Sequence, residues 1–163
     1  MTSTDQRVAA RATGRIAALR TTSFAAVVMI LLVLVFGMVV NLYAKLPASD
    51  EGRDLFAAFG AAVSAGPVPL AVHAVLGTLL VLTSFGAVWR AVLTRRAGLI
   101  VIAGVALLAV LMAWFSGTGF VGHQGNAASF SMALATAVAA LCYATVLFVT
   151  PAVATTKRSA GGA

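Results

Sequence analysis

The stretch "SFAAVVMILLVLVFGMVVNLY", residues 23–43, decides the fold class, because it is a continuous apolar run of about 21 residues. A helix rises about 1.5 Å per residue, so about 20 residues cross the hydrocarbon core of a bilayer. Similar runs follow at about residues 67–89, 97–115 and 120–149. None alternates between polar and apolar residues as the strands of a membrane β-barrel do. The sequence therefore predicts an all-α polytopic membrane protein, an antiparallel up-down four-helix transmembrane bundle over residues 23–150.

The composition supports a single membrane domain. Of the 163 residues, 61% are hydrophobic and 9% are charged, whereas a soluble domain carries about 25% charged residues.

A basic segment precedes the first run, as in a signal peptide. That run exceeds the roughly 7 to 15 apolar residues of a signal peptide, and no convincing small-residue cleavage site follows it. We therefore expect the first run to be retained as a membrane span.

The distribution of cations predicts the orientation of the chain. Nine of the eleven lie in the N-terminal tail (residues 1–22), in the link between the second and third runs, and in the C-terminal tail (residues 151–163). These nine are Arg7, Arg11, Arg15, Arg20, Arg90, Arg95, Arg96, Lys157 and Arg158; the link 44–66 is mixed, with Lys45 and Arg53 beside Asp50, Glu51 and Asp54. The positive-inside rule places these regions in the cytoplasm and the links 44–66 and 116–122 outside. Topology and anionic lipid thus account for the net charge of +7, and no nucleic-acid partner is expected.

The basic tail has a helical pattern of its own. Arg7, Arg11 and Arg15 are spaced four residues apart, with Thr4 or Asp5 available as a cap. The favoured interpretation is a frayed basic tail that only enforces topology, and the alternative is a short interfacial helix that presents arginines to lipid headgroups. The preference for arginine over lysine is typical of a GC-rich bacterial genome. The predicted location is the bacterial plasma membrane, with several spans and both termini cytoplasmic.

Two histidines stand out against this apolar background. His73 lies about 9 Å inside the second span, counted from Pro67. His123 is predicted a few residues inside the fourth span, which enters from the same outer side. Spans two and four are diagonal in an up-down bundle, with axes about 14 Å apart. That separation suits a flat metal-containing macrocycle with one histidine ligand on each of its two faces. Haem iron commonly takes histidine as such a ligand.

Small residues near these histidines would leave room for a flat ring. Gly77 lies one helical turn after His73, and Ala127 lies one turn after His123. The first span contributes Gly37, with Asn41 one turn nearer the outer surface. The alternative is that both histidines are unrelated interfacial residues and that the glycines are packing notches between helices.

Other chemistry is sparse. Cys142 is the only cysteine, and no carboxylate lies inside a predicted span, which disfavours a proton- or cation-coupled transporter. No phosphate-binding loop, serine nucleophile motif or zinc-protease motif is present. We expect no catalytic residues. Trp89 and Trp114, near opposite span ends, are interpreted as aromatic-belt anchors.

Three segments together resemble a known family. They are "FGMVVNLYAKLP" (residues 36–47), "VHAVLGTLLVL" (residues 72–82) and "GHQGNAASFSMALA" (residues 122–135). In this order they resemble one four-helix half of a haem A synthase, over residues 24–150. The resemblance implies axial haem ligands at His73 and His123 and a porphyrin near the outer leaflet.

The departures from that family bear on activity. Leu70 stands where the catalytic half has a glutamate, the link 44–66 lacks a cysteine pair, and only one half is present. The chain is more similar to the b-type, non-catalytic half, so haem A synthase activity is not expected.

The leading hypothesis is a small membrane b-type cytochrome with one haem b, exchanging electrons with quinol or a periplasmic redox partner. One alternative is a non-redox accessory subunit of a respiratory or other membrane complex. Small residues would then serve helix association, among them Gly37, Gly104, Ala128 and Ser131. The other alternative is a carrier of a small molecule or lipid, which predicts a persistent cavity without a chromophore.

Overall fold

The computed structural model describes residues 3–43, 54–123 and 126–150, without the side chains at 55, 58, 119–123 and 126. The described chain is helical. Its helices are α1 (Ser3–Tyr43), α2 (Leu55–Ser64), α3 (Val68–Thr94), α4 (Ala97–His123) and α5 (Asn126–Val149). Four of them, α1, α3, α4 and α5, are long and apolar enough to cross a membrane. The predicted all-α polytopic architecture is confirmed.

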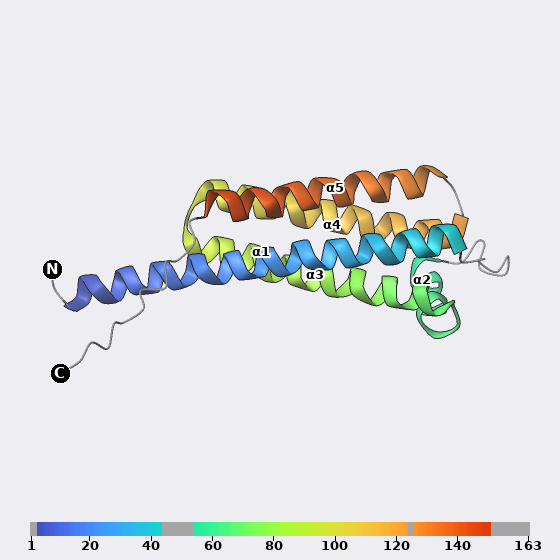
Figure 1. Cartoon of the computed structure of the whole chain (residues 1–163), viewed down its shortest axis with the longest axis horizontal. Coiled ribbons are helices and arrows are strands. Elements are labelled where there is room, and N and C mark those ends of the chain that lie inside the picture. Colours follow the sequence, from blue (N-terminus) through green and yellow to red (C-terminus); the bar gives the residue numbers. More distant parts are fainter. Residues whose placement is uncertain (1–2, 44–53, 124–125, 151–163) are drawn as a thin grey trace, which may run out of the picture.

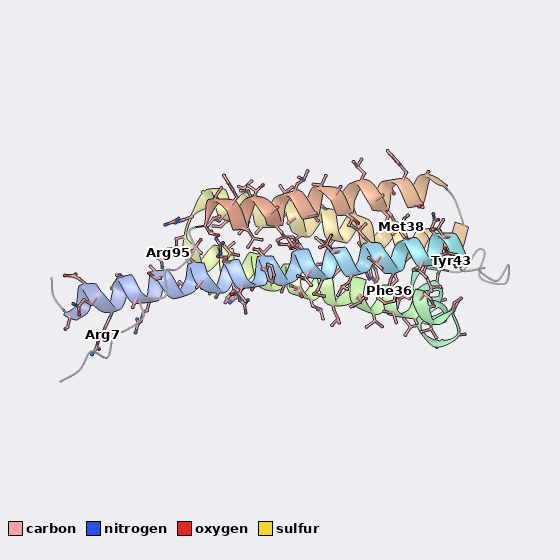
Figure 2. All side chains as sticks on the ribbon, in the orientation of Figure 1. Arg7, Phe36, Met38, Tyr43 and Arg95 are labelled. Carbon is pink, nitrogen blue, oxygen red and sulfur yellow. The ribbon has the colours of Figure 1, made fainter. Side chains whose placement is uncertain are left out.

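The four long helices form an up-down bundle (Figure 1). Helix α1 packs against α3 and α5, and α4 packs against the same two helices. Helices α3 and α5 are therefore diagonal to each other, as the sequence predicted for the second and fourth spans. Short α2 packs against α3 and α4 at one end of the bundle, here named the α2 end. The opposite end, where Arg95 closes α3, is named the basic end (Figure 2).

Helix α1 continues without a break through the predicted tail and the first span. Its 41 residues correspond to about 60 Å of helix, and the part that carries Arg7 projects beyond the bundle (Figures 1 and 2). The described part of the tail, residues 3–22, is therefore neither frayed nor a separate short helix, but the first part of α1. The tail is rich in alanine and arginine, which favour helix, so a helix established in the membrane extends through it.

The links also differ from the sequence prediction. Within the predicted outer link, Leu55–Ser64 forms α2. The Asp54 carboxylate caps α2 by accepting from the Ala57 amide at 2.9 Å. Helix α4 continues to His123, and α5 begins only at Asn126. The glycines in this region favour a loop, but backbone groups in an apolar environment are satisfied best by continuing the helix.

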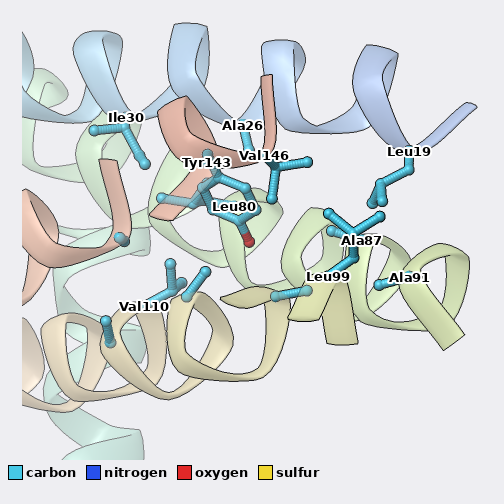
Figure 3. Packing of buried hydrophobic residues seen from close by; sticks show 14 residues of the cluster. Leu19, Ala26, Ile30, Leu80, Ala87, Ala91, Leu99, Val110, Tyr143 and Val146 are labelled. Carbon is cyan, nitrogen blue, oxygen red and sulfur yellow. The ribbon is translucent and has the colours of Figure 1, made fainter. Parts of the chain in front are cut away.

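The core of the basic half is built largely from small residues. Ala26, Ala87 and Ala106 are fully buried, which lets the helix backbones approach closely. Tyr143 and Ile30 fill the remaining space (Figure 3). Large apolar side chains face outward, as shown by Leu31 (57% exposed), Leu108 (64%) and Phe148 (91%). This arrangement suits a bundle surrounded by lipid.

Arginines close the helices at the basic end. Arg15 donates to the Leu93 carbonyl of α3 at 3.0 Å. Arg20 donates to the carbonyls of Leu147, at 2.9 Å, and Thr150 at the end of α5. The last carbonyls of a helix lack partners within the helix and carry its negative dipole end. Cations from α1 therefore fix the ends of α3 and α5.

Candidate functional site

A cavity lies in the half of the bundle nearer α2. Its volume is about 180 Å³. All five helices contribute to its wall, which is mostly apolar. The polar side chains in the wall are Asn41, His73, Trp114, Thr118, Ser129 and Thr136.

His73 is the imidazole in this wall. It lies in the second turn of α3, which starts after Pro67 and has a proline in its first turn. Its Nδ1 lies 3.0 Å from the Val33 carbonyl oxygen of α1. A carbonyl only accepts, so Nδ1 carries the proton and Nε2 keeps a free lone pair. Metal-binding histidines commonly have this same arrangement, with the second nitrogen donating to a backbone carbonyl.

Gly37 leaves the space on α1 into which the imidazole of His73 packs. A Cβ at residue 37 would lie 3.0 Å from Cε1 of the imidazole and 3.3 Å from its Nδ1. Any side chain there would push the ring away from α1. Gly37 therefore leaves the space that the His73 ring occupies.

Gly117 leaves space for the side chain of Met132 in the same way. Met132 of α5 lies in the cavity wall, and its Sδ would be only 3.3 Å from a Cβ at Gly117 of α4. The hydroxyl of Ser131 donates to that of Ser116 at 2.9 Å. This bond holds α4 and α5 in register beside Met132.

Aromatic side chains close the cavity toward α2. The indole nitrogen of Trp114 donates to Thr78 Oγ1 at 3.2 Å, and Phe59 of α2 lies 5.6 Å from Trp114 between ring centroids. Trp114 is half-buried in the cavity wall. Its interpretation as an aromatic-belt anchor is therefore wrong, because the indole finds its hydrogen-bond partner within the bundle. Trp89 is 67% exposed, and its role as an anchor stays a prediction.

The cavity opens between α1 and α5. The wall residues with exposed side chains belong to these two helices, namely Leu34, Met38 and Asn41 on α1 and Ala133 on α5. Met38 is 58% exposed and is labelled on α1 in Figure 2. The open side therefore faces the apolar surroundings of the bundle.

The predicted site residues are brought together only in part. Gly37, Asn41, His73 and Gly77 all line the cavity. Ala127 is exposed and is not part of the described cavity wall.

The prediction that His123 lies in the fourth span is wrong. The structure places this residue at the end of α4, because α4 continues through the predicted loop. His123 is thus on a neighbour of α3 rather than on the diagonal helix, and its side chain lies outside the described part of the structure.

Met132, Phe59 and Trp114 line the cavity, although the sequence analysis did not predict that they belong to the site. Met132 lies three and four residues from Ser129 and Thr136, and this helical spacing was the available signal. Phe59 belongs to the apolar segment "LFAAFGAAV" in the predicted link, whose length suits a short helix. The sequence around Trp114 does not show whether its indole faces the interior of the bundle or its surroundings.

Among the described wall residues, the side chains that commonly bind haem iron are the imidazole of His73 and the thioethers of Met38 and Met132. Within the described residues, no three His, Cys, Asp or Glu side chains are placed to hold an ion. A porphyrin supplies the equatorial bonds to its iron and needs protein ligands only on the axis. The cavity volume of about 180 Å³ is below the roughly 300 to 1,000 Å³ of ligand pockets. A porphyrin would therefore also occupy the open side between α1 and α5.

Comparison with known protein families, with curated proteins and with solved structures found no match to this chain.

Proposed function

We propose that this chain is a small integral-membrane haem protein, a b-type cytochrome that holds one haem b between α3 and α5. The observation that carries the proposal is the hydrogen bond of the His73 imidazole, which decides which of its two nitrogens carries the proton. Its Nδ1 is bonded to the Val33 carbonyl at 3.0 Å, which leaves the Nε2 lone pair at the wall of an apolar cavity. An imidazole oriented in this way is a ready axial ligand.

The surrounding residues have separate roles in this proposal. Gly37 seats the imidazole against α1, and Gly77 lets the Trp114 indole pack close to α3, where a Cβ at residue 77 would lie 3.9 Å from Trp114 Cδ1. Trp114 and Phe59 exclude water from the α2 side. When bound, haem supplies one-electron chemistry. A neutral ligand in an apolar wall favours the ferrous form, so we expect a relatively high potential.

The proposal extends to location and partners. The basic end carries Arg15, Arg20, Arg90, Arg95 and Arg96, which supports a cytoplasmic position for that end in a bacterial plasma membrane. The cavity then lies toward the opposite leaflet. Quinol or a periplasmic redox protein would exchange electrons there.

The test is a visible absorption spectrum of the detergent-purified chain, oxidised and then reduced with dithionite, with haem supplied during expression. We expect a sharp Soret band and narrow reduced α and β bands. His73→Ala should lose this spectrum or become five-coordinate, and free imidazole added to that variant should restore it. His73→Ala must retain the helical circular dichroism and the elution volume of the parent, so that a loss of haem is not a loss of fold.

A colourless parent protein would overturn the proposal. The second candidate, a carrier of a small apolar molecule or lipid, would then lead, because the cavity opens to the apolar surroundings between α1 and α5. The accessory-subunit alternative assigned several small residues to association with other subunits, and two of them already have contacts within this chain. Gly37 contacts His73 and Ser131 bonds Ser116, so both are used within the chain.

A further inference from the structure

We propose that Met132 is the second axial ligand, so that the haem iron is held by His73 and Met132. This inference rests on the proposed function and specifies its site. It differs from the pair His73 and His123 that the sequence predicted.

The first argument is the direction from which a second ligand must come. Axial ligands approach iron from opposite faces of the porphyrin. His73 is on α3, and the helix diagonal to α3 is α5. Among the residues that α5 contributes to the described cavity wall, Met132 carries the side chain that commonly ligates haem iron. His123 ends α4, which is a direct neighbour of α3.

The second argument is the chemistry of the donor atoms. Among the described wall residues, imidazole and thioether groups are the side chains that commonly ligate haem iron, and they belong to His73, Met38 and Met132. Met38 is 58% exposed, and its helix α1 is adjacent to α3. Met132 is half-buried in the wall. It is therefore the thioether that meets both the chemical and the geometric requirement.

The third argument is that both ligands are seated alike. The ring of His73 packs where Gly37 has no side chain, and the sulfur of Met132 packs where Gly117 has none. Each ligand thus rests against a glycine of the adjacent helix, α1 for His73 and α4 for Met132. The bond from Ser131 to Ser116 fixes the helix pair next to the sulfur, which preorganises it for one position.

The experiment compares the haem-loaded parent with Met132→Leu, Met132→His and His123→Ala. Leucine nearly conserves volume, and circular dichroism with gel filtration checks the fold of each variant. The oxidised parent should show the weak far-red sulfur-to-iron charge-transfer band of histidine and methionine ligation. Met132→Leu should lose that band and become five-coordinate, binding carbon monoxide when reduced. Met132→His should stay six-coordinate with a lowered potential, and His123→Ala should match the parent.

Each other result has a defined meaning. A six-coordinate spectrum that survives in Met132→Leu would overturn the inference. If His123→Ala instead lost that spectrum, the pair would be His73 and His123, and the proposed function would stand. A colourless parent overturns the haem proposal and this inference together.

Discussion

The imidazole of His73 on α3 occupies the space that the absent side chain of Gly37 leaves on α1. A Cβ at residue 37 would lie 3.0 Å from Cε1 of the ring, which is closer than ordinary contact. The same approach brings Nδ1 within 3.0 Å of the Val33 carbonyl. One glycine therefore decides both where the ring sits and which of its nitrogens stays free.

Gly37→Ala should displace the imidazole and break its bond to Val33. We expect haem per chain to fall at least several-fold, measured by titrating haem into the purified apoprotein. Overpacking should also lower the free energy of unfolding by about 1 to 3 kcal/mol, because the rigid ring has little space to move.

The matched control for that variant is Gly104→Ala. A Cβ at residue 104 would meet nothing within 4 Å, so this change should only add helix propensity, up to about 1 kcal/mol. Equal behaviour of the two alanine variants, in haem titration and thermal unfolding, would show that the ring is not seated on Gly37.

Ala133→Phe should obstruct the opening of the cavity between α1 and α5. Ala133 is an exposed wall residue, so an aromatic ring there should slow entry of an apolar ligand by about tenfold or more. The measurement is the stopped-flow rate of haem uptake in detergent, or of a fluorescent apolar probe. The control is Leu134→Phe, at an outward position that is 56% exposed. Equal rates in both variants would place the entry route elsewhere.

Arg20→Ala should loosen the end of α5. The guanidinium donates to the Leu147 and Thr150 carbonyls, and hydrogen bonds from charged groups contribute about 1.5 to 3 kcal/mol. We expect a loss of that size in thermal unfolding, with faster amide exchange in the last turn of α5. Arg7→Ala, on the projecting part of α1, should change stability by less than about 0.5 kcal/mol. Similar losses in both variants would argue against this closing role.

The orientation can be tested with single cysteines. Cys142→Ala removes the only cysteine, and Arg7→Cys or Phe56→Cys then adds one. Phe56 lies on α2 and is 80% exposed. A membrane-impermeant maleimide should label residue 7 in inside-out vesicles and residue 56 in right-side-out vesicles. The reverse pattern would invert the proposed topology.

Several features of the site follow from the sequence alone. His73 was identifiable because an imidazole inside an apolar span is rare and needs a partner. Gly37, Gly77 and Asn41 were identified by their depth along their spans, which depends only on counting residues. Ala127 was chosen by the same counting from His123, and that choice failed because the helix boundary between them was misplaced.

Met132 and Trp114 show what counting residues does not provide. Both lie in spans that are apolar around most of their circumference, so periodicity in the sequence hardly separates an inward from an outward face. The inward face is decided by which helices pack together and how closely. Gly117 and Ser116 of α4 decide it for Met132, and Thr78 of α3 decides it for Trp114.

The sequence by itself determined the four membrane spans and their alternating directions, because about 20 apolar residues must form a helix that satisfies its own backbone in lipid. Only the tertiary structure decided where α4 ends, that α2 closes the cavity, and which side chains meet His73. These depend on contacts between helices far apart in the chain. In lipid, such contacts are selected by close packing and hydrogen bonding rather than by hydrophobicity.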